Sequence, residues 1–241
     1  MYIETKKRSL LKGISWRFIA TTTTIIIVYF FFGRLDLAIA AGFLETLAKI
    51  LLYFFHERAW QKIKFGKQRI EPFNLWFTGL PLSGKSTLAD AVYTELNKLD
   101  IPLERIDSKD IRDVIPNVGF KRDDRHQHLT RVGHLIKTLQ NNSVSAIASF
   151  ISPYTETRQA IADMTNNYIE VYVKADIETC IARDKTGIYL KAQAGELQNF
   201  TGVSDVFEQP VHPDIIIDSN KQSIAEATQI IVTFIKKHYM P

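Results

Sequence analysis

The feature that most constrains this 241-residue chain is a strand-like run followed by a glycine-bounded loop and a helix-like segment. The run NLWFTG, which starts at Asn74, is short and apolar, and the segment KSTLADAVYTELNKL has the apolar spacing of a helix. The residues between them, GLPLSGKS, fit the pattern G-x-x-x-x-G-K-[ST]. In this context the pattern predicts a loop whose backbone N–H groups surround nucleotide phosphates at the positive end of a helix.

Each part of this loop is expected to contact a different part of the nucleotide. Lys85 is expected to neutralise the β- and γ-phosphate oxygens, and the Ser86 hydroxyl is expected to coordinate Mg²⁺. The predicted cofactors are therefore ATP and Mg²⁺. The predicted ATP-binding residues are Gly79, Leu80, Pro81, Leu82, Ser83, Gly84, Lys85, Ser86 and Thr87.

A second strand-like run, LERID, ends at Asp107 and is followed by another helix-like segment. Open α/β sheets bind ligands beyond the carboxyl ends of their strands, so Asp107 is expected beside the loop. There it can hold Mg²⁺ through water or accept the proton of an acceptor hydroxyl. We therefore predict Lys85 and Asp107 as catalytic residues, and Ser86 and Asp107 as the metal-binding residues.

Further strand-like runs, at Ser145–Ser149 and Tyr168–Val173, alternate with helix-like segments. This β/α alternation predicts a parallel sheet flanked by helices, an α/β fold of the P-loop kinase type. The predicted domains are residues 1–62, a polar linker at 63–73, and the P-loop domain at 74–241. The only cysteine, Cys180, excludes an intrachain disulfide and is predicted to be a structural thiol.

The N-terminal segment has the composition of a membrane domain. Phe18–Gly33 carries no charge, and Leu37–Phe55 has the length of a bilayer-spanning helix, although Glu45 and Lys49 lie within it. The two runs predict a transmembrane helical hairpin. A hairpin that lies in the membrane interface, or that packs as a soluble helix pair, stays open as the alternative. Basic residues flank the hairpin and only Arg34 lies in its turn, so the positive-inside rule predicts a two-span membrane protein with both termini in the cytoplasm.

Basic charge is confined to the same segment. Residues 1–70 carry 12 of the 30 lysines and arginines but only 4 of the 26 aspartates and glutamates. The rest of the chain is mildly acidic, whereas a nucleic-acid-binding domain needs a basic face of its own. The net charge of +4 therefore does not indicate a nucleic-acid partner.

Besides the loop, the chain contains the motifs SFISPY, IEVYV…A-R-D and AGELQNFTG. Through the loop and these motifs, the chain resembles the adenylyl-sulfate kinase family from about Asn74 to Asp218. The resemblance implies transfer of the γ-phosphate of ATP to the 3′-hydroxyl of adenylyl sulfate, which gives 3′-phosphoadenylyl sulfate. It also implies an acceptor site. The matching residues are Arg112 and Arg125 at the anionic groups, Phe120 and Phe200 around the adenine, Ile151 and Ser152 in the wall, Lys191 in a mobile lid, and His128 in place of an asparagine.

The chain departs from the family pattern beside the acceptor. Asp107–Asp110 reads DSKD where the family usually has DGDN, so Lys109 replaces the second carboxylate. His128 and Leu190 also depart from the usual residues, and Pro81-Leu82 replaces small residues of the loop. These changes leave two alternatives open, a kinase of another nucleotide-like 3′-hydroxyl and a non-catalytic nucleotide-binding membrane scaffold.

The N-terminal segment contains the stretches KRSLLKGISWRF and FLETLAKILLYFFHERAW. Through them it resembles a small two-helix membrane domain of unknown function. The predicted protein is thus a membrane-tethered adenylyl-sulfate kinase-like phosphotransferase. Its expected partners are ATP, adenylyl sulfate or a related nucleotide, the membrane through the hairpin, and a second copy of the chain in a homodimer.

Overall fold

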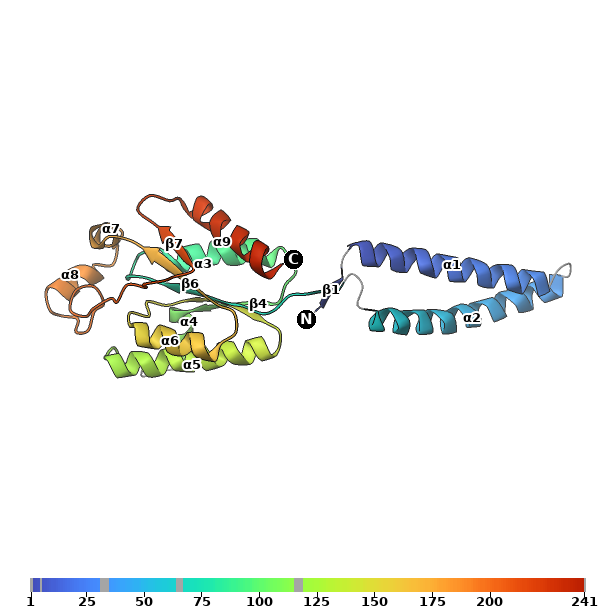
Figure 1. Ribbon diagram of the computed structural model, residues 1–241, viewed down its shortest axis with the longest axis horizontal. Coiled ribbons are helices and arrows are strands. Elements are labelled where there is room, and N and C mark those ends of the chain that lie inside the picture. Colours follow the sequence, from blue (N-terminus) through green and yellow to red (C-terminus); the bar gives the residue numbers. More distant parts are fainter. Residues whose placement is uncertain (1, 5, 31–34, 64–66, 115–118, 241) are drawn as a thin grey trace. The chain divides into compact units, whose positions relative to one another are not determined.

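The computed structural model describes residues 2–4, 6–30, 35–63, 67–114 and 119–240. The chain divides into two compact units, Met1–Ile70 and Glu71–Pro241, each with its own secondary structure (Figure 1).

The N-terminal unit is a helical hairpin with a small sheet. Helices α1 (Lys6–Phe30) and α2 (Leu35–Lys62) form the hairpin, and strand β1 (Tyr2–Glu4) pairs antiparallel with β2 (Lys67–Arg69). Neither strand is predicted from the sequence, because three residues are too few to show alternation, and β2 lies within the predicted linker. The turn that contains Arg34 lies outside the described residues.

Polar contacts join the start of α1 to the end of α2, so the two helices are antiparallel. The Arg8 guanidinium donates to the carbonyl of Trp60 and, over 2.7 Å, to that of Ile63. Nearby, Ser15 Oγ lies 2.8 Å from His56 Nε2, which also accepts a 3.0 Å hydrogen bond from Trp60 Nε1. These contacts fix the pairing of the helices at the end of the hairpin.

In the part of the chain that the structure describes, neither α1 nor α2 combines the length and the apolarity needed to cross a membrane. The structure therefore confirms the predicted helical hairpin but not its transmembrane placement.

The second unit contains a five-stranded sheet in the order β4-β5-β3-β6-β7, with every neighbouring pair parallel. Helices α3 and α9 lie on one face and α5 and α6 on the other (Figure 1). The predicted parallel sheet flanked by helices is thus confirmed. Its strands are β3 (Asn74–Thr78), β4 (Leu103–Asp107), β5 (Ser145–Ser149), β6 (Tyr168–Lys174) and β7 (Ile215–Asp218). Its helices are α3 (Lys85–Asn97), α4 (Ser108–Val114), α5 (Arg122–Asn141), α6 (Thr155–Met164), α7 (Ile177–Ala182), α8 (Ile188–Gln193) and α9 (Ile224–Tyr239).

The strand order places the predicted site residues at one end of the sheet. The chain leaves the central strand β3 for β4 and β5 on one side and then crosses to β6 and β7 on the other. In the register of these strands, Ser149 lies opposite both Phe77 and Asp107. The loop after β3, the end of β4 and the end of β5 therefore meet where open parallel sheets bind their ligands.

A buried apolar cluster fixes the face of the sheet under α5 and α6. Trp76 stacks on Phe150 with ring centroids 5.1 Å apart, and Ile136 and Ile161 pack into the same cluster. The Trp76 indole also donates a 3.0 Å hydrogen bond to Ser152 Oγ. The core thus holds the loop after β5 in place.

Candidate functional site

The loop between β3 and α3 has the backbone geometry that its glycines predict. Gly79 has a positive φ of 151°, and a Cβ there would lie 2.5 Å from the carbonyl oxygen of Val173. Gly84 precedes α3 in the left-handed region, with φ 100°. Leu82 also has a positive φ of 61°, a conformation that a non-glycine side chain disfavours. Gly79 is therefore needed for a close contact with β6, and Gly84 for a left-handed backbone conformation at the start of α3.

Lys85 lies under this loop and is only 8% exposed. Its ammonium donates to the carbonyl of Leu80 over 2.6 Å and lies 3.4 Å from Ser83 Oγ. Burial lowers the pKa of Lys85 to about 8, although the nearby Cys180 and Asp107 favour the charged form. A bound phosphate would supply the negative charge that this buried ammonium lacks.

A cavity of about 520 Å³ adjoins the loop and extends along α9. It is lined by loop and α3 residues 82–88, by Arg183, and by residues of the β7–α9 region. Arg183 donates to the Ser83 carbonyl over 3.2 Å and to the Ser219 carbonyl over 2.7 Å. The position and size of this cavity suit a nucleotide attached to the loop by its phosphates.

Arg183 is a candidate site residue that the sequence does not single out. Its only signal is the motif A-R-D, and the role of this arginine depends on the packing of α7 beside the loop after β7. Such packing between distant segments leaves no local pattern.

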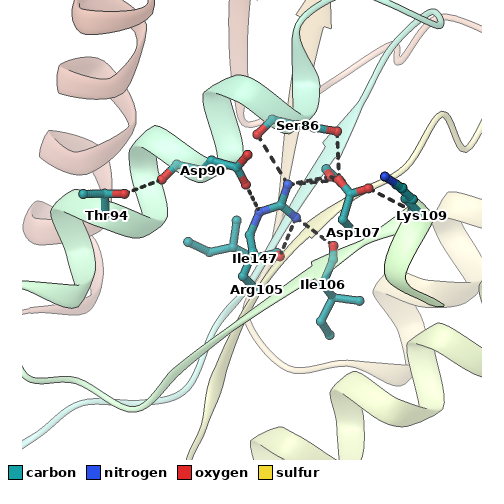
Figure 2. A network of polar contacts seen from close by, with 9 residues as sticks. Ser86, Asp90, Thr94, Arg105, Ile106, Asp107, Lys109 and Ile147 are labelled. Carbon is teal, nitrogen blue, oxygen red and sulfur yellow. Dashed lines mark hydrogen bonds and ion pairs between the residues drawn. The ribbon is translucent and has the colours of Figure 1, made fainter. Parts of the chain in front are cut away.

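The Asp107 carboxylate is the polar centre of the site (Figure 2). Its Oδ2 atom accepts hydrogen bonds from Ser86 Oγ over 2.8 Å, from Arg105 Nη2 over 3.1 Å, and from Ser149 Oγ. Its Oδ1 atom accepts a 3.0 Å hydrogen bond from the backbone amide of Lys109. One lone-pair direction of Oδ1 is left for a further contact.

These contacts keep Asp107 ionised. Burial alone would raise the pKa of its carboxyl, but the Lys109 amide, the Ser149 and Ser86 hydroxyls and the Arg105 charge together lower it. Asp107 is therefore a weak proton acceptor and a strong hydrogen-bond acceptor. Its oxygens and the Ser86 hydroxyl are the hard donors that Mg²⁺ prefers, so the residues present suit this ion.

The Ser86 hydroxyl gives its hydrogen to Asp107, which leaves its oxygen lone pairs available on the loop side. Among the described side chains there is no cluster of three or more His, Cys, Asp or Glu residues that could hold a metal ion on its own. This donor set matches a site in which the nucleotide phosphates supply further metal ligands.

A second pocket brings together most of the predicted acceptor residues. It has a volume of about 30 Å³, and its lining includes Arg112, Arg125, His128, Ile151 and Ser152. The structure therefore places these five positions side by side, beyond the carboxyl ends of β4 and β5.

Two side chains of this pocket have polar atoms without partners. His128 is 3% exposed, and neither of its ring nitrogens has a hydrogen-bond partner. The Nε atom of Arg112 is also buried without a partner. Burial lowers the pKa of His128, and the charges of Arg112 and Arg131 lower it further, which favours the neutral imidazole. Buried polar groups without hydrogen-bond partners are unfavourable, so a polar ligand in this pocket would supply the partners that His128 and Arg112 lack.

Arg125 joins the segments that carry the two predicted aromatic residues. It donates to the carbonyl of Phe120 over 2.8 Å and to that of Asn199, the neighbour of Phe200, over 2.6 Å. The guanidinium carbon of Arg112 lies 4.5 Å from the ring centroid of Phe120. Phe120 is exposed, whereas Phe200 also packs edge-on against the buried Tyr189. Arg125 is thus engaged largely with the main chain, and Arg112 keeps more of its donors for a ligand.

The predicted lid residue Lys191 is exposed on α8 and lines neither of these two pockets. The neighbouring Tyr189 anchors α8 to the loop, since its hydroxyl donates to the Pro81 carbonyl over 2.9 Å. Three residues after Asp107 differ from the family pattern: Ser108, Lys109 and Asp110. Of these, Lys109 and Asp110 are exposed at the start of α4.

The pKa of Lys85 leads to a prediction about nucleotide binding. Only the ammonium form attracts phosphate, so affinity should fall as the pH rises through about 8. We expect the dissociation constant of metal-free ADP to increase on the order of tenfold between about pH 7 and about pH 9.5. Titration calorimetry on the full chain measures this change. A Lys85→Arg variant stays charged over this range, so a similar pH dependence in that variant would contradict the prediction.

Comparisons with known proteins agree with this geometry. The family described as adenylylsulphate kinase matches residues 71–218, and a family described as a predicted membrane protein of unknown function matches residues 10–61. The adenylyl-sulfate kinase of Oceanobacillus iheyensis is 38% identical over 191 residues, which cover 75% of this chain and 96% of that protein. The adenylyl-sulfate kinase of Thermodesulfovibrio yellowstonii is 41% identical over 167 residues, covering 68% and 84%.

A solved structure shows the same fold. It is the adenylyl-sulfate kinase of Mycobacterium tuberculosis in complex with AMPPNP and adenylyl sulfate, which is 30% identical to this chain with a TM-score of 0.66. The match covers 70% of this chain and 99% of that one. The phosphate loop, the Asp107 network and these relatives lead to one conclusion: the chain belongs to the adenylyl-sulfate kinase family and is a phosphotransferase that uses ATP with Mg²⁺.

Proposed function

We propose that the chain transfers the γ-phosphate of ATP to the 3′-hydroxyl of adenylyl sulfate and does so at the cytoplasmic face of a membrane. The observation that carries the first part is the juxtaposition of the loop, the Asp107 carboxylate and the pocket of Arg112 and His128. The nucleotide and the acceptor would then approach each other at the ends of β3, β4 and β5.

The loop amides and Lys85 would hold the ATP phosphates, and the Arg183 side of the larger cavity would hold its base. A bound Mg²⁺ would neutralise charge on the phosphates, and Ser86 and Asp107 would hold the ion. Phosphoryl transfer of this kind depends mainly on positioning and charge, so a strong base is not required. The remaining lone pair of Asp107 Oδ1 could orient the acceptor hydroxyl.

The acceptor would occupy the second pocket, which at about 30 Å³ would have to widen to admit a nucleotide. Arg112, with its unpaired Nε, would contact the sulfate or phosphate oxygens, and His128 would donate or accept one hydrogen bond. Phe120 would cover the acceptor base. Phe200 packs on Tyr189 and would contact the same base from the opposite segment, while Lys191 would move with α8.

The proposed reaction is tested with purified full-length chain, ATP, Mg²⁺ and a panel of nucleotide acceptors that carry a free 3′-hydroxyl. We expect adenylyl sulfate to be the best acceptor, and we expect Lys85→Ala to reduce turnover by at least about 10²-fold. A different nucleotide that outperforms adenylyl sulfate would favour the alternative acceptor suggested by Lys109 and His128. Lys98→Ala, at an exposed ion pair between the C-cap of α3 and Glu95, is the control and should keep full activity.

His128 is expected to act on the acceptor and not on ATP. Removing one hydrogen bond in a buried site weakens binding by about fivefold to thirtyfold. His128→Ala should therefore raise KM for adenylyl sulfate by about this factor and leave KM for ATP unchanged. The matched control is His134→Ala, an exposed histidine of the same helix. If the two variants behave alike, or if KM for ATP changes instead, His128 does not contact the acceptor.

The membrane part of the proposal rests on the N-terminal unit. Its family match is described as a predicted membrane protein, and both of its helices expose large apolar side chains. On α1 these include Phe18 and Phe30, and on α2 they include Phe55. Exposed large apolar side chains are unfavourable in water and favour contact with lipid. The basic residues that flank the hairpin favour cytoplasmic termini. The homodimer expected from the sequence stays a prediction.

Membrane attachment is tested by flotation of the full chain with phosphatidylglycerol-containing vesicles. We expect the chain to float, and we expect a Phe18→Glu/Phe55→Glu variant to lose most of this binding because charge is costly in lipid. Val211→Glu changes an exposed apolar residue of the kinase unit and should float as the unaltered chain does. A chain that stays at the bottom of the gradient would refute the attachment.

A further inference from the structure

Arg105 makes an extensive set of polar contacts beside the phosphate loop (Figure 2). Its Nε donates to Asp90 Oδ1 over 2.8 Å, and its Nη2 donates to Asp107 Oδ2 over 3.1 Å and to Ser149 Oγ over 2.8 Å. Its Nη1 donates to the carbonyl of Ile106 over 2.8 Å. A single guanidinium thus links α3, β4 and β5.

The position of Arg105 on β4 explains this geometry. Residues two apart on a strand point to the same side, so Arg105 and Asp107 share the face that α3 covers. Ile106 points to the opposite face and enters the apolar cluster under α5 and α6. Because Ser86 lies in the first turn of α3, the arginine and the loop serine reach the same carboxylate from two directions.

Burial makes these contacts specific. The Arg105 side chain is 13% exposed and the Asp107 side chain is 20% exposed, whereas the Asp90 side chain is 66% exposed. An ion pair that is shielded from water is stronger than one at the surface, so the contact with Asp107 dominates. The planar guanidinium fork also fixes direction, which a flexible ammonium does not.

The orientation of Asp107 determines what Ser86 can do. Oδ2 accepts the Ser86 hydrogen only while the carboxylate plane faces the loop, and Arg105 holds that same oxygen from the side of α3. Rotation of the carboxylate would allow the Ser86 hydroxyl to turn. Its lone pairs would then no longer be directed to the place where a metal ion meets the nucleotide phosphates.

We propose that Arg105 is a positioning residue of the phosphoryl-transfer site: it orients Asp107, and through it Ser86, toward nucleotide-bound Mg²⁺. The proposal rests on the proposed function for the reaction it serves. Neither the phosphate-loop pattern nor the family resemblance assigns a role to this position. Here the neighbouring Lys109 supplies only a backbone amide to the carboxylate.

The test separates the metal-dependent part of nucleotide binding from the rest. The ADP affinity of the full chain is measured by calorimetry with Mg²⁺ and with EDTA, and the ratio of the two affinities reports how well the site uses the metal. Loss of a hydrogen bond to a charged group corresponds to roughly tenfold. Arg105→Met should lower the ratio by about this factor while the affinity in EDTA stays unchanged.

Three further variants make the test decisive. Arg105→Lys keeps the charge without the fork and should give an intermediate ratio. Asp90→Asn removes only the exposed partner and should lower the ratio less than Arg105→Met does. Lys98→Met, an exposed change at the C-cap of α3, should leave it unaltered.

An unaltered ratio in Arg105→Met, or an equal loss of affinity with and without metal, would overturn the proposal. If Arg105→Met does not fold, an unaltered ratio in Arg105→Lys overturns it instead. Because ADP binding needs no acceptor, failure of this test is distinct from failure to phosphorylate adenylyl sulfate.

Discussion

The hydrogen bond between the Ser86 hydroxyl and the Asp107 carboxylate is the contact on which the site depends. It joins the first turn of α3 to the end of β4, and it exists because the parallel register brings β3, β4 and β5 to a common end. The carboxylate can accept this bond only in its ionised form. The Lys109 amide, the Ser149 hydroxyl and the Arg105 guanidinium keep it ionised against the effect of burial.

Whereas Asp107 is held in its charged form, burial disfavours the charged form of the basic groups of the site. Burial lowers the pKa of Lys85, Arg112, Arg125 and His128, and only some of this penalty is offset by acidic neighbours. A protein that buries several basic groups with incomplete pairing pays in stability unless an anionic ligand arrives. Such perturbed groups gather at functional sites for this reason. The two pockets therefore suit two anionic ligands, one at Lys85 and one at Arg112.

Two basic residues near the carboxylate leave its contact with Ser86 intact. Lys109 stands where the family usually has a second acidic group after β4, and its side chain is exposed. Arg105 places a largely buried cation on the side of α3. Both residues make the local charge more positive, which favours a carboxylate that holds a fixed position over one that takes up a proton. This agrees with a reaction that depends on positioning.

Local sequence was sufficient for the phosphate loop, the alternation of strands and helices, and the two N-terminal helices. Glycine placement, periodic apolar residues and charge-free runs act through neighbouring residues, so they leave readable patterns. The resemblance to a family supplied the acceptor residues, and the structure gathers five of them around one small pocket.

Tertiary structure decided the contacts between segments that lie far apart in the sequence. Arg105 and Arg183 become part of the site only because α3 covers one face of β4 and α7 packs beside the loop after β7. The short strands β1 and β2 form only by pairing across more than sixty residues of chain. The sequence alone determined the phosphate loop, strands β3 to β6 and the two N-terminal helices, because those depend on near neighbours. Which side chains meet the Asp107 carboxylate depended on the packing of distant segments, which no local pattern records.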